Sequence, residues 1–124
     1  MRIDFGPGSE WGGISQAHSE LMARNDGHLL HYRVYFAALW RANQKGHAEF
    51  RMGELATVLV RDDGVIPSRQ SVTNAVARAK ALDLIGHDST VRCLTLPHHH
   101  FQKGGRGGRR CSVHGDVTPW TRAA

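Results

Sequence analysis

Long hydrophobic runs are missing from this sequence. No stretch of its 124 residues approaches the length that a membrane-spanning helix needs. The first segment, MRIDFGPGSEWGG, has no apolar core of the kind found in secretory signals. These two absences predict a cytoplasmic protein that does not use a membrane.

Cysteine is scarce as well. The chain has two cysteines, Cys93 and Cys111. Because the cytosol is reducing, we expect no standing disulfide between them, which leaves free thiols or metal ligands as the alternatives.

Patterns of catalytic residues are also missing. The His- and Cys-containing end of the chain raises the idea of a metal-dependent nuclease, yet Asp116 is the one acidic residue near it. Paired carboxylates and a phosphate-binding loop with a base beside it do not occur there. The sequence therefore predicts a protein that is not an enzyme.

Apolar residues suffice for one modest core. Hydrophobic residues make up 40% of the chain, and 14 residues are glycine. This composition predicts a compact centre with irregular ends. We expect a domain over 28–96, an irregular N-terminal extension with a short helix over 1–27, and a basic Gly/Arg/His tail over 97–124.

Positive charge increases along the chain. Lys and Arg number 16 against 11 acidic residues, for a net charge of +5. Segments 1–27, 28–97 and 98–124 contribute −2, +3 and +4 to this total. A basic centre and a more basic tail favour a polyanionic partner, most often nucleic acid, although the charge could also serve solubility alone.

Four helices are expected where apolar residues recur at three- and four-residue steps: 15–24, 28–43, 53–60 and 67–86. Ser15, Asp26 and Ser68 are the expected N-caps of the first, second and fourth. The second helix has a broad apolar face that predicts a core helix: Leu29, Tyr32, Phe36, Leu39 and Trp40.

Two stretches of the chain have the pattern of short strands. Residues 47–52 alternate between polar and apolar, and 84–87 with 91–96 flank a turn at Asp88-Ser89, which predicts a β-hairpin. The expected fold class is therefore α+β, mostly α.

The helix expected over 67–86 has two different sides. One is an apolar stripe: Val72, Ala75, Val76, Ala79 and Leu82. The other is polar early and small later: Gln70, Thr73, Asn74, Ala77 and Ala81, with Arg69 and Arg78 at the margins. Such a surface can approach another molecule closely.

The stretch PSRQSVTNAVARAKALDLIG, residues 67–86, resembles the recognition-helix region of winged helix-turn-helix domains in phage and plasmid regulators and replication proteins. MGELATVLV, residues 52–60, is similar to the second helix of that family. The resemblance covers 28–96 and implies a three-helix core with a short β-hairpin wing. Asp83 stands where the family commonly has a glycine in a left-handed conformation, which Asp tolerates.

The resemblance implies double-stranded DNA as the partner, with the helix that starts at Ser68 in the major groove. Arg69 would pair with guanine, and Gln70 and Asn74 with adenine. The DNA-contacting residues implied in the domain are Ser68, Arg69, Gln70, Thr73, Asn74, Arg78, His87 and Arg92.

The tail segment KGGRGGRR, residues 103–110, adds a second candidate DNA contact. Glycine allows close approach of the backbone, and arginine suits narrow minor grooves. The residues expected to contact DNA are Lys103, Arg106, Arg109 and Arg110. A flexible solubilising tail is the alternative.

Cys111 and His114 have a chelating spacing. Structural zinc takes four thiolate and imidazole ligands in a tetrahedron. Alternate residues of an extended chain point to the same side, so Cys93 and His99 are the expected other half, with the histidine on either side of His99 as an alternative. We expect one structural zinc site, and two unrelated free thiols are the other interpretation.

Together these patterns predict sequence-specific binding of double-stranded DNA by a small transcription regulator or replication-associated factor, phage- or plasmid-encoded. The alternative is a winged-helix protein-interaction module, for which Tyr35 lies off the apolar stripe. RNA binding through the tail is a third hypothesis. The sequence does not predict the oligomeric state, so a homodimer stays open.

Overall fold

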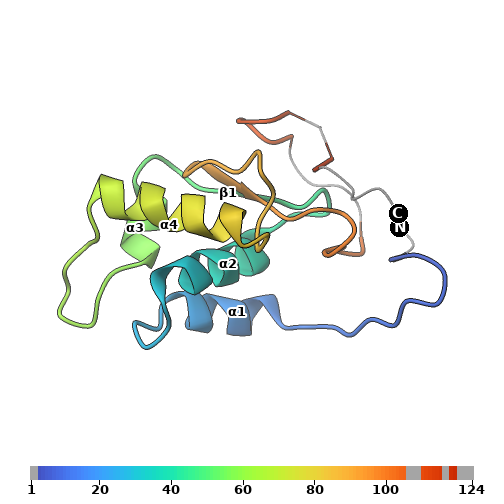
Figure 1. Ribbon diagram of the computed structural model, residues 1–124, viewed down its shortest axis with the longest axis horizontal. Coiled ribbons are helices and arrows are strands. Elements are labelled where there is room, and N and C mark those ends of the chain that lie inside the picture. Colours follow the sequence, from blue (N-terminus) through green and yellow to red (C-terminus); the bar gives the residue numbers. More distant parts are fainter. Residues whose placement is uncertain (1–2, 106–109, 116–117, 120–124) are drawn as a thin grey trace.

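The computed structural model describes residues 3–105, 110–115 and 118–119, which form four helices and two short strands (Figure 1). In chain order these elements are α1 (Gln16–Ala23), α2 (Leu30–Arg41), β1 (His47–Glu49), α3 (Glu54–Val58), α4 (Arg69–Ala81) and β2 (Cys93–Thr95). The expected α+β, mostly helical class is confirmed, and the order is consistent with a winged-helix-like arrangement. No helix within the described ranges has the length and apolarity to cross a bilayer.

Helix α2 is the centre of the fold. Figure 1 shows it between α1 and α4. Val34, Ala37 and Ala38 on α2 are fully buried, as are Ala23 of α1 and Ala79 of α4. Because alanine side chains are small, the helices on both sides can approach α2 closely.

Side-chain caps begin α1 and α4 as expected. The Ser15 Oγ accepts a hydrogen bond from the backbone N–H of His18 at 3.1 Å. The Ser68 Oγ accepts one from the backbone N–H of Ser71, also at 3.1 Å. Each cap satisfies an N–H group that has no partner within the helix.

The start and the buried face of α2 differ from the expectation. Leu29 occupies the N-cap position, and the Asp26 carboxylate instead accepts hydrogen bonds from the Asp62 N–H at 3.0 Å and from Arg33 at 3.5 Å. Leu29 and Tyr32, expected in the core, are 64% and 41% exposed. Since Arg33 is buried on the same turn, the inward face is rotated toward it.

Arg33 is 1% exposed and binds backbone carbonyl groups from two other segments. Its guanidinium donates to the carbonyls of Ala23 at 2.9 Å, Leu59 at 3.2 Å, Val58 at 3.4 Å and Val60 at 3.0 Å. These carbonyls lie at the ends of α1 and α3, where helices leave acceptors unsatisfied. Burial lowers the pKa of Arg33, and two nearby aspartates act in the opposite direction.

The hairpin expected from 84–87 and 91–96 does not form, because 84–87 is not a strand and β2 pairs with β1 instead. On the other edge of β2, the Ser89 Oγ accepts the Thr95 N–H at 2.9 Å. The Gly86 N–H donates to the Thr95 carbonyl at 2.7 Å, so one backbone group and one side chain take the place of a strand partner there. Gly86 lies so close to the Thr95 hydroxyl that a Cβ atom would collide with it.

Helix α4 buries four of the five residues expected in its apolar stripe: Val72, Ala75, Val76 and Ala79. Leu82, just past its last turn, is 40% exposed. Asp83 has a φ of 57°, so the expected left-handed position after the helix is confirmed.

Replacing Arg33 with methionine should cost about 3–5 kcal/mol in the free energy of unfolding, because three buried carbonyls and one half-buried carbonyl lose their donor. Chemical denaturation monitored by circular dichroism measures this loss. Arg24→Met is the matched control: its 44% exposed side chain pairs with Glu20 at 3.0 Å and should cost less than about 1 kcal/mol. Equal losses in the two variants would contradict the role assigned to Arg33.

Candidate functional site

Two histidines and two cysteines from three parts of the chain meet beside the small sheet. The candidate ligand atoms of His47, Cys93, Cys111 and His114 all lie within 4.8 Å of one another. His47 is 2%, Cys93 0% and Cys111 5% exposed. Such a buried set of soft sulfur and imidazole donors could hold a metal ion.

Strand pairing positions two of these side chains. In the antiparallel register His47 lies opposite Thr95, and Glu49 lies opposite Cys93. His47 and Cys93 are therefore diagonal neighbours across the sheet. The Nδ1 of His47 is 3.5 Å from the Sγ of Cys93.

A tight turn positions the other two ligands. The Gly115 N–H donates to the Cys111 carbonyl at 2.9 Å, which closes the turn. The backbone N–H groups of Val113 and His114 donate to the Cys111 Sγ at 3.4 and 3.3 Å. The Nδ1 of His114 is 3.8 Å from the same sulfur. The turn thus presents both side chains from one segment of four residues.

Two contacts fasten this turn to the domain. Ser112 donates to the Glu49 carboxylate through its backbone N–H and its hydroxyl. The Nε2 of His114 is 2.8 Å from the carbonyl oxygen of Asp88, which can only accept a hydrogen bond. Nε2 therefore carries a proton, and in the neutral imidazole Nδ1 presents its lone pair toward Cys111.

The two thiols have opposite pKa shifts. Burial raises the pKa of Cys93, and its contact with Cys111 acts in the same direction. Burial would also raise the pKa of Cys111, but hydrogen bonds from the backbone N–H groups of His114 and Val113 outweigh it, and the net shift is downward. Burial would lower the pKa of His114, whereas its bond to Asp88 raises it and prevails.

Three of the four residues expected at the metal site come together, and the fourth is His47 rather than His99. The chain does not stay extended after β2: the N–H groups of His100 and Phe101 both donate to the Pro97 carbonyl at 3.0 Å, which forms a turn. This turn takes His99 off the side of the sheet that carries Cys93. The His99 ring lies 5.9 Å from that of His100.

His47 was missed because its role depends on the pairing of β1 with β2. Its signal in the sequence was weak: one histidine at the start of an alternating segment. The expected hairpin paired β2 with residues 84–87, and this pairing did not predict that His47 lies near Cys93.

The outward face of α4 is the second candidate site. Every residue expected to contact DNA from this helix and its N-cap is exposed: Ser68, Arg69, Gln70, Thr73, Asn74 and Arg78. The Gln70 side-chain amide donates to the Asn74 Oδ1 at 2.7 Å, so these two amides are held together. Ala77 and Ala81 on the same face are also exposed, and their small side chains leave room for another molecule to approach the later turns closely.

The two residues expected at the wing lie in the turns between α4 and β2. Arg92 is half-buried and donates through Nε to the Phe50 carbonyl at 2.9 Å. His87 is exposed, and its Nε2 is 3.2 Å from the Asp83 carboxylate. Arg92 therefore has a fixed stem, whereas His87 lies on the surface.

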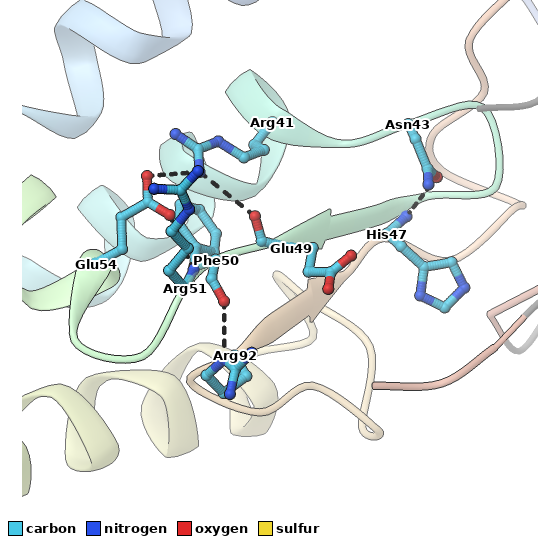
Figure 2. A pocket seen from close by; sticks show the side chains of 8 residues that line it. All are labelled: Arg41, Asn43, His47, Glu49, Phe50, Arg51, Glu54 and Arg92. Atoms are coloured by element: carbon cyan, nitrogen blue, oxygen red, sulfur yellow. Dashed lines mark hydrogen bonds and ion pairs between the residues drawn. The ribbon is translucent and has the colours of Figure 1, made fainter. Parts of the chain in front are cut away.

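Arg92 lies where two surface pockets meet. One, of about 590 Å³, is polar; Figure 2 shows Arg41 and Arg51 near Glu54 at one end of it and His47 at the other. Arg41 is 2.8 Å from the Glu54 carboxylate. Burial would raise the pKa of Glu54, but hydrogen bonds from Arg51 and Arg41 outweigh it and lower that pKa.

The other pocket, of about 480 Å³, lies between α4, the start of α3 and the turn that precedes β2. Arg69 and Thr73 of α4 line it together with Arg92. Met52, which is 83% exposed, and Val91 add apolar walls. Three residues expected to contact DNA thus share one hollow.

The residues expected to bind DNA from the tail fall into two groups. Lys103 is half-buried, and Arg110 is exposed directly before Cys111. Arg106 and Arg109 lie outside the described residues.

Tyr35 is half-buried rather than free on the surface. Its ring lies 6.0 Å from those of Phe36 and His100. Burial raises the pKa of its hydroxyl. The residue that favoured a protein-docking role therefore packs against the domain itself.

Comparison with known proteins gives no family for this chain. No protein-family model matches it. No curated protein and no solved structure gives a significant match either. Function is therefore inferred from the residues of the chain itself.

The variants His47→Ala and His99→Ala distinguish the two histidines as ligands. Titration with Co²⁺ should give the visible absorption bands of a tetrahedral cobalt–thiolate site in the wild type and in His99→Ala, because the four-residue cluster is intact in both. His47→Ala should weaken Co²⁺ binding at least tenfold. The reverse order would contradict the assignment.

Proposed function

We propose that this protein is a small winged-helix-like protein that binds double-stranded DNA sequence-specifically, stabilised by one structural zinc ion. It would act without catalysis, as a transcription regulator or a replication-associated factor. The observation that carries the proposal is the outward face of α4, which exposes hydrogen-bonding side chains in its first turns and methyl groups later.

This face has the chemistry that base recognition needs. An α-helix fits the major groove, and amide and guanidinium groups read adenine and guanine edges there. Gln70 and Asn74 are one turn apart and hydrogen-bonded to each other, so they can act as a pair on one base step. Arg69 and Arg78 flank them, and no acidic residue lies in the first turn of α4.

Positive charge continues from α4 onto the neighbouring surface. Arg69 and Arg92 line one pocket, and Arg92, Arg51 and Arg41 line the next. Glu54 already neutralises Arg41. Arg51 and Arg92 are therefore the better candidates to bind phosphate groups beside the groove that α4 would occupy.

Three ligand-to-ligand distances in the cluster match those of a tetrahedral zinc site, and all four ligand atoms lie within 4.8 Å of one another. Zinc bonds of about 2.3 Å to sulfur and about 2.0–2.1 Å to nitrogen, at tetrahedral angles, separate two sulfurs by about 3.8 Å and sulfur from nitrogen by about 3.6 Å. The Cys93 and Cys111 sulfurs are 3.5 Å apart, and the two Sγ–Nδ1 distances are 3.5 and 3.8 Å. Four protein ligands leave no open position, so this zinc would be structural.

The zinc site would also connect the tail to the DNA-facing surface. His114 contacts the Asp88 carbonyl in the same turns that carry His87 and Arg92. Arg110 directly precedes the ligand Cys111. A bound zinc would therefore fix one end of the Arg/Gly segment and support the turns that lie next to α4.

Selection from a random-sequence duplex library with purified protein should enrich a defined motif. The double variant Gln70→Ala/Asn74→Ala should lose about 1–3 kcal/mol of discrimination at one or two positions of that motif while it keeps most of its salt-dependent affinity. Arg51→Ala should instead weaken binding to all sequences and reduce the salt dependence.

Arg24→Ala is the control for the double variant and for Arg51→Ala. Because Arg24 lies on the far side of α2 from α4, this variant should bind DNA like the wild type. Affinity that does not change with salt concentration would remove the phosphate contacts from the proposal. Capture of one stoichiometric protein with no DNA retained would indicate a protein-interaction module instead. Competition by single-stranded RNA would indicate that the protein binds RNA through its tail.

Chelation of the metal should destabilise the domain. A cross-link between distant chain segments contributes about 2–4 kcal/mol, which corresponds to a fall of roughly 10 °C or more in Tm for a domain of this size. Calorimetry before and after treatment with a chelator measures it, and restored zinc should reverse it. An unchanged Tm, with zinc shown to be removed by elemental analysis, would contradict a structural role.

A further inference from the structure

Cys93 and Cys111 are the two cysteines of the chain, and their sulfur atoms are 3.5 Å apart. They come from segments 18 residues apart in sequence, so the fold and not local geometry brings them together. A thiol pair at this distance can do two things: share a metal ion, or join as a disulfide once the metal leaves.

We propose that this pair is an oxidation site, at which a peroxide converts Cys93 and Cys111 to an intramolecular disulfide and thereby releases the metal. The proposal rests on the zinc-binding part of the function proposed above. It does not depend on DNA binding.

The two sulfurs differ in how they can be reached and moved. Cys93 is fully buried in β2, whereas Cys111 is 5% exposed and lies in a turn outside the named helices and strands. A disulfide needs the sulfurs about 2.05 Å apart, so closure takes a shift of about 1.5 Å. The turn that carries Cys111 can supply this shift more easily than the strand.

The chemistry balances with one peroxide molecule as the oxidant. The Cys111 sulfur attacks one peroxide oxygen, the O–O bond breaks, and Cys111 becomes a sulfenic acid as hydroxide leaves. The Cys93 sulfur then attacks the Cys111 sulfur, the S–S bond forms, and the second hydroxide leaves. Two protons from solvent convert both hydroxides to water, while the two sulfurs together lose two electrons and the divalent metal ion departs.

The product stays assembled. Ser112 still binds the Glu49 carboxylate and His114 still contacts the Asp88 carbonyl, since neither contact uses a sulfur atom. The disulfide keeps the turn beside β2, and Cys93 next to the sulfenic acid protects Cys111 from further oxidation. A reductant can therefore restore both thiols and allow the metal to return.

The test treats the zinc-loaded full chain with hydrogen peroxide. A chromogenic chelator should record release of the zinc, Ellman's reagent should record loss of both thiols, and denaturing mass spectrometry should show the loss of two hydrogen atoms from a monomer. Dithiothreitol should restore the thiols and zinc uptake. Addition of oxygen atoms to either cysteine without the disulfide, or a covalent dimer, would overturn the proposal.

Cys111→Ser is the matched variant, and it should leave Cys93 unable to form the intramolecular disulfide. Because this variant can also lose its fold, metal-free wild-type protein supplies a second measurement: peroxide should oxidise it to the same monomeric disulfide. If the wild type takes up no zinc, the zinc part of the proposed function fails, and the mass measured on metal-free protein still decides whether the pair joins.

Discussion

The guanidinium of Arg33 is the constraint on which the helical part of the structure depends. Helix α3 has five residues, too few to be stable alone. Its end is held because Arg33 donates to the Val58, Leu59 and Val60 carbonyls, and the same group binds the Ala23 carbonyl at the end of α1. One side chain of α2 thereby fixes two neighbouring helices. A charged group placed this deep is tolerated because its hydrogen bonds are satisfied by carbonyl groups that need a donor.

The candidate metal centre would stabilise a different part of the domain, the two-stranded sheet. The sheet has two strands of three residues each, which supply little stability of their own. The cluster joins both strands to a turn near the end of the chain, and Glu49 and Asp88 hold that turn through Ser112 and His114. The apolar core reaches one face of this sheet through Ala48 and Leu94, and a metal ion would support the side that carries His47 and Cys93. Helix α4 packs against α2 through its buried stripe and keeps a polar, uncovered face.

Local patterns in the sequence predicted the helices well. The caps at Ser15 and Ser68 and the buried stripe of α4 follow from the chemistry of one residue or one turn, whereas the left-handed Asp83 was expected from the winged-helix resemblance. Helix α2 was placed correctly, but its inward face was wrong because hydrophobicity alone assigned Tyr32 to the core and gave no reason to bury Arg33. Arg33 is buried in preference to Tyr32 because its guanidinium donates hydrogen bonds to several carbonyl groups at once.

Long-range pairing was the part that the sequence could not supply. The segment 84–87 does not form a strand and makes a backbone hydrogen bond to β2 through Gly86, while β1 is the strand that pairs with β2. This pairing places His47, and not His99, in the candidate metal site. Cys93, Cys111 and His114 were found because residue type and spacing carry most of the signal for a metal ligand, whereas the choice among nine histidines depends on strand register.

The turn at 111–115 is attached to the domain by side-chain contacts as well as by the covalent chain. Its attachment to the domain runs through Glu49, Asp88 and the ligand cluster, whereas the glycines at 104 and 105, within the Arg/Gly segment, are exposed. With metal bound, a protease that cuts at those glycines would leave two pieces that still migrate as one folded particle. The cut would divide the covalent chain but not the folded unit, because the peptide after the cut would stay attached through coordination bonds.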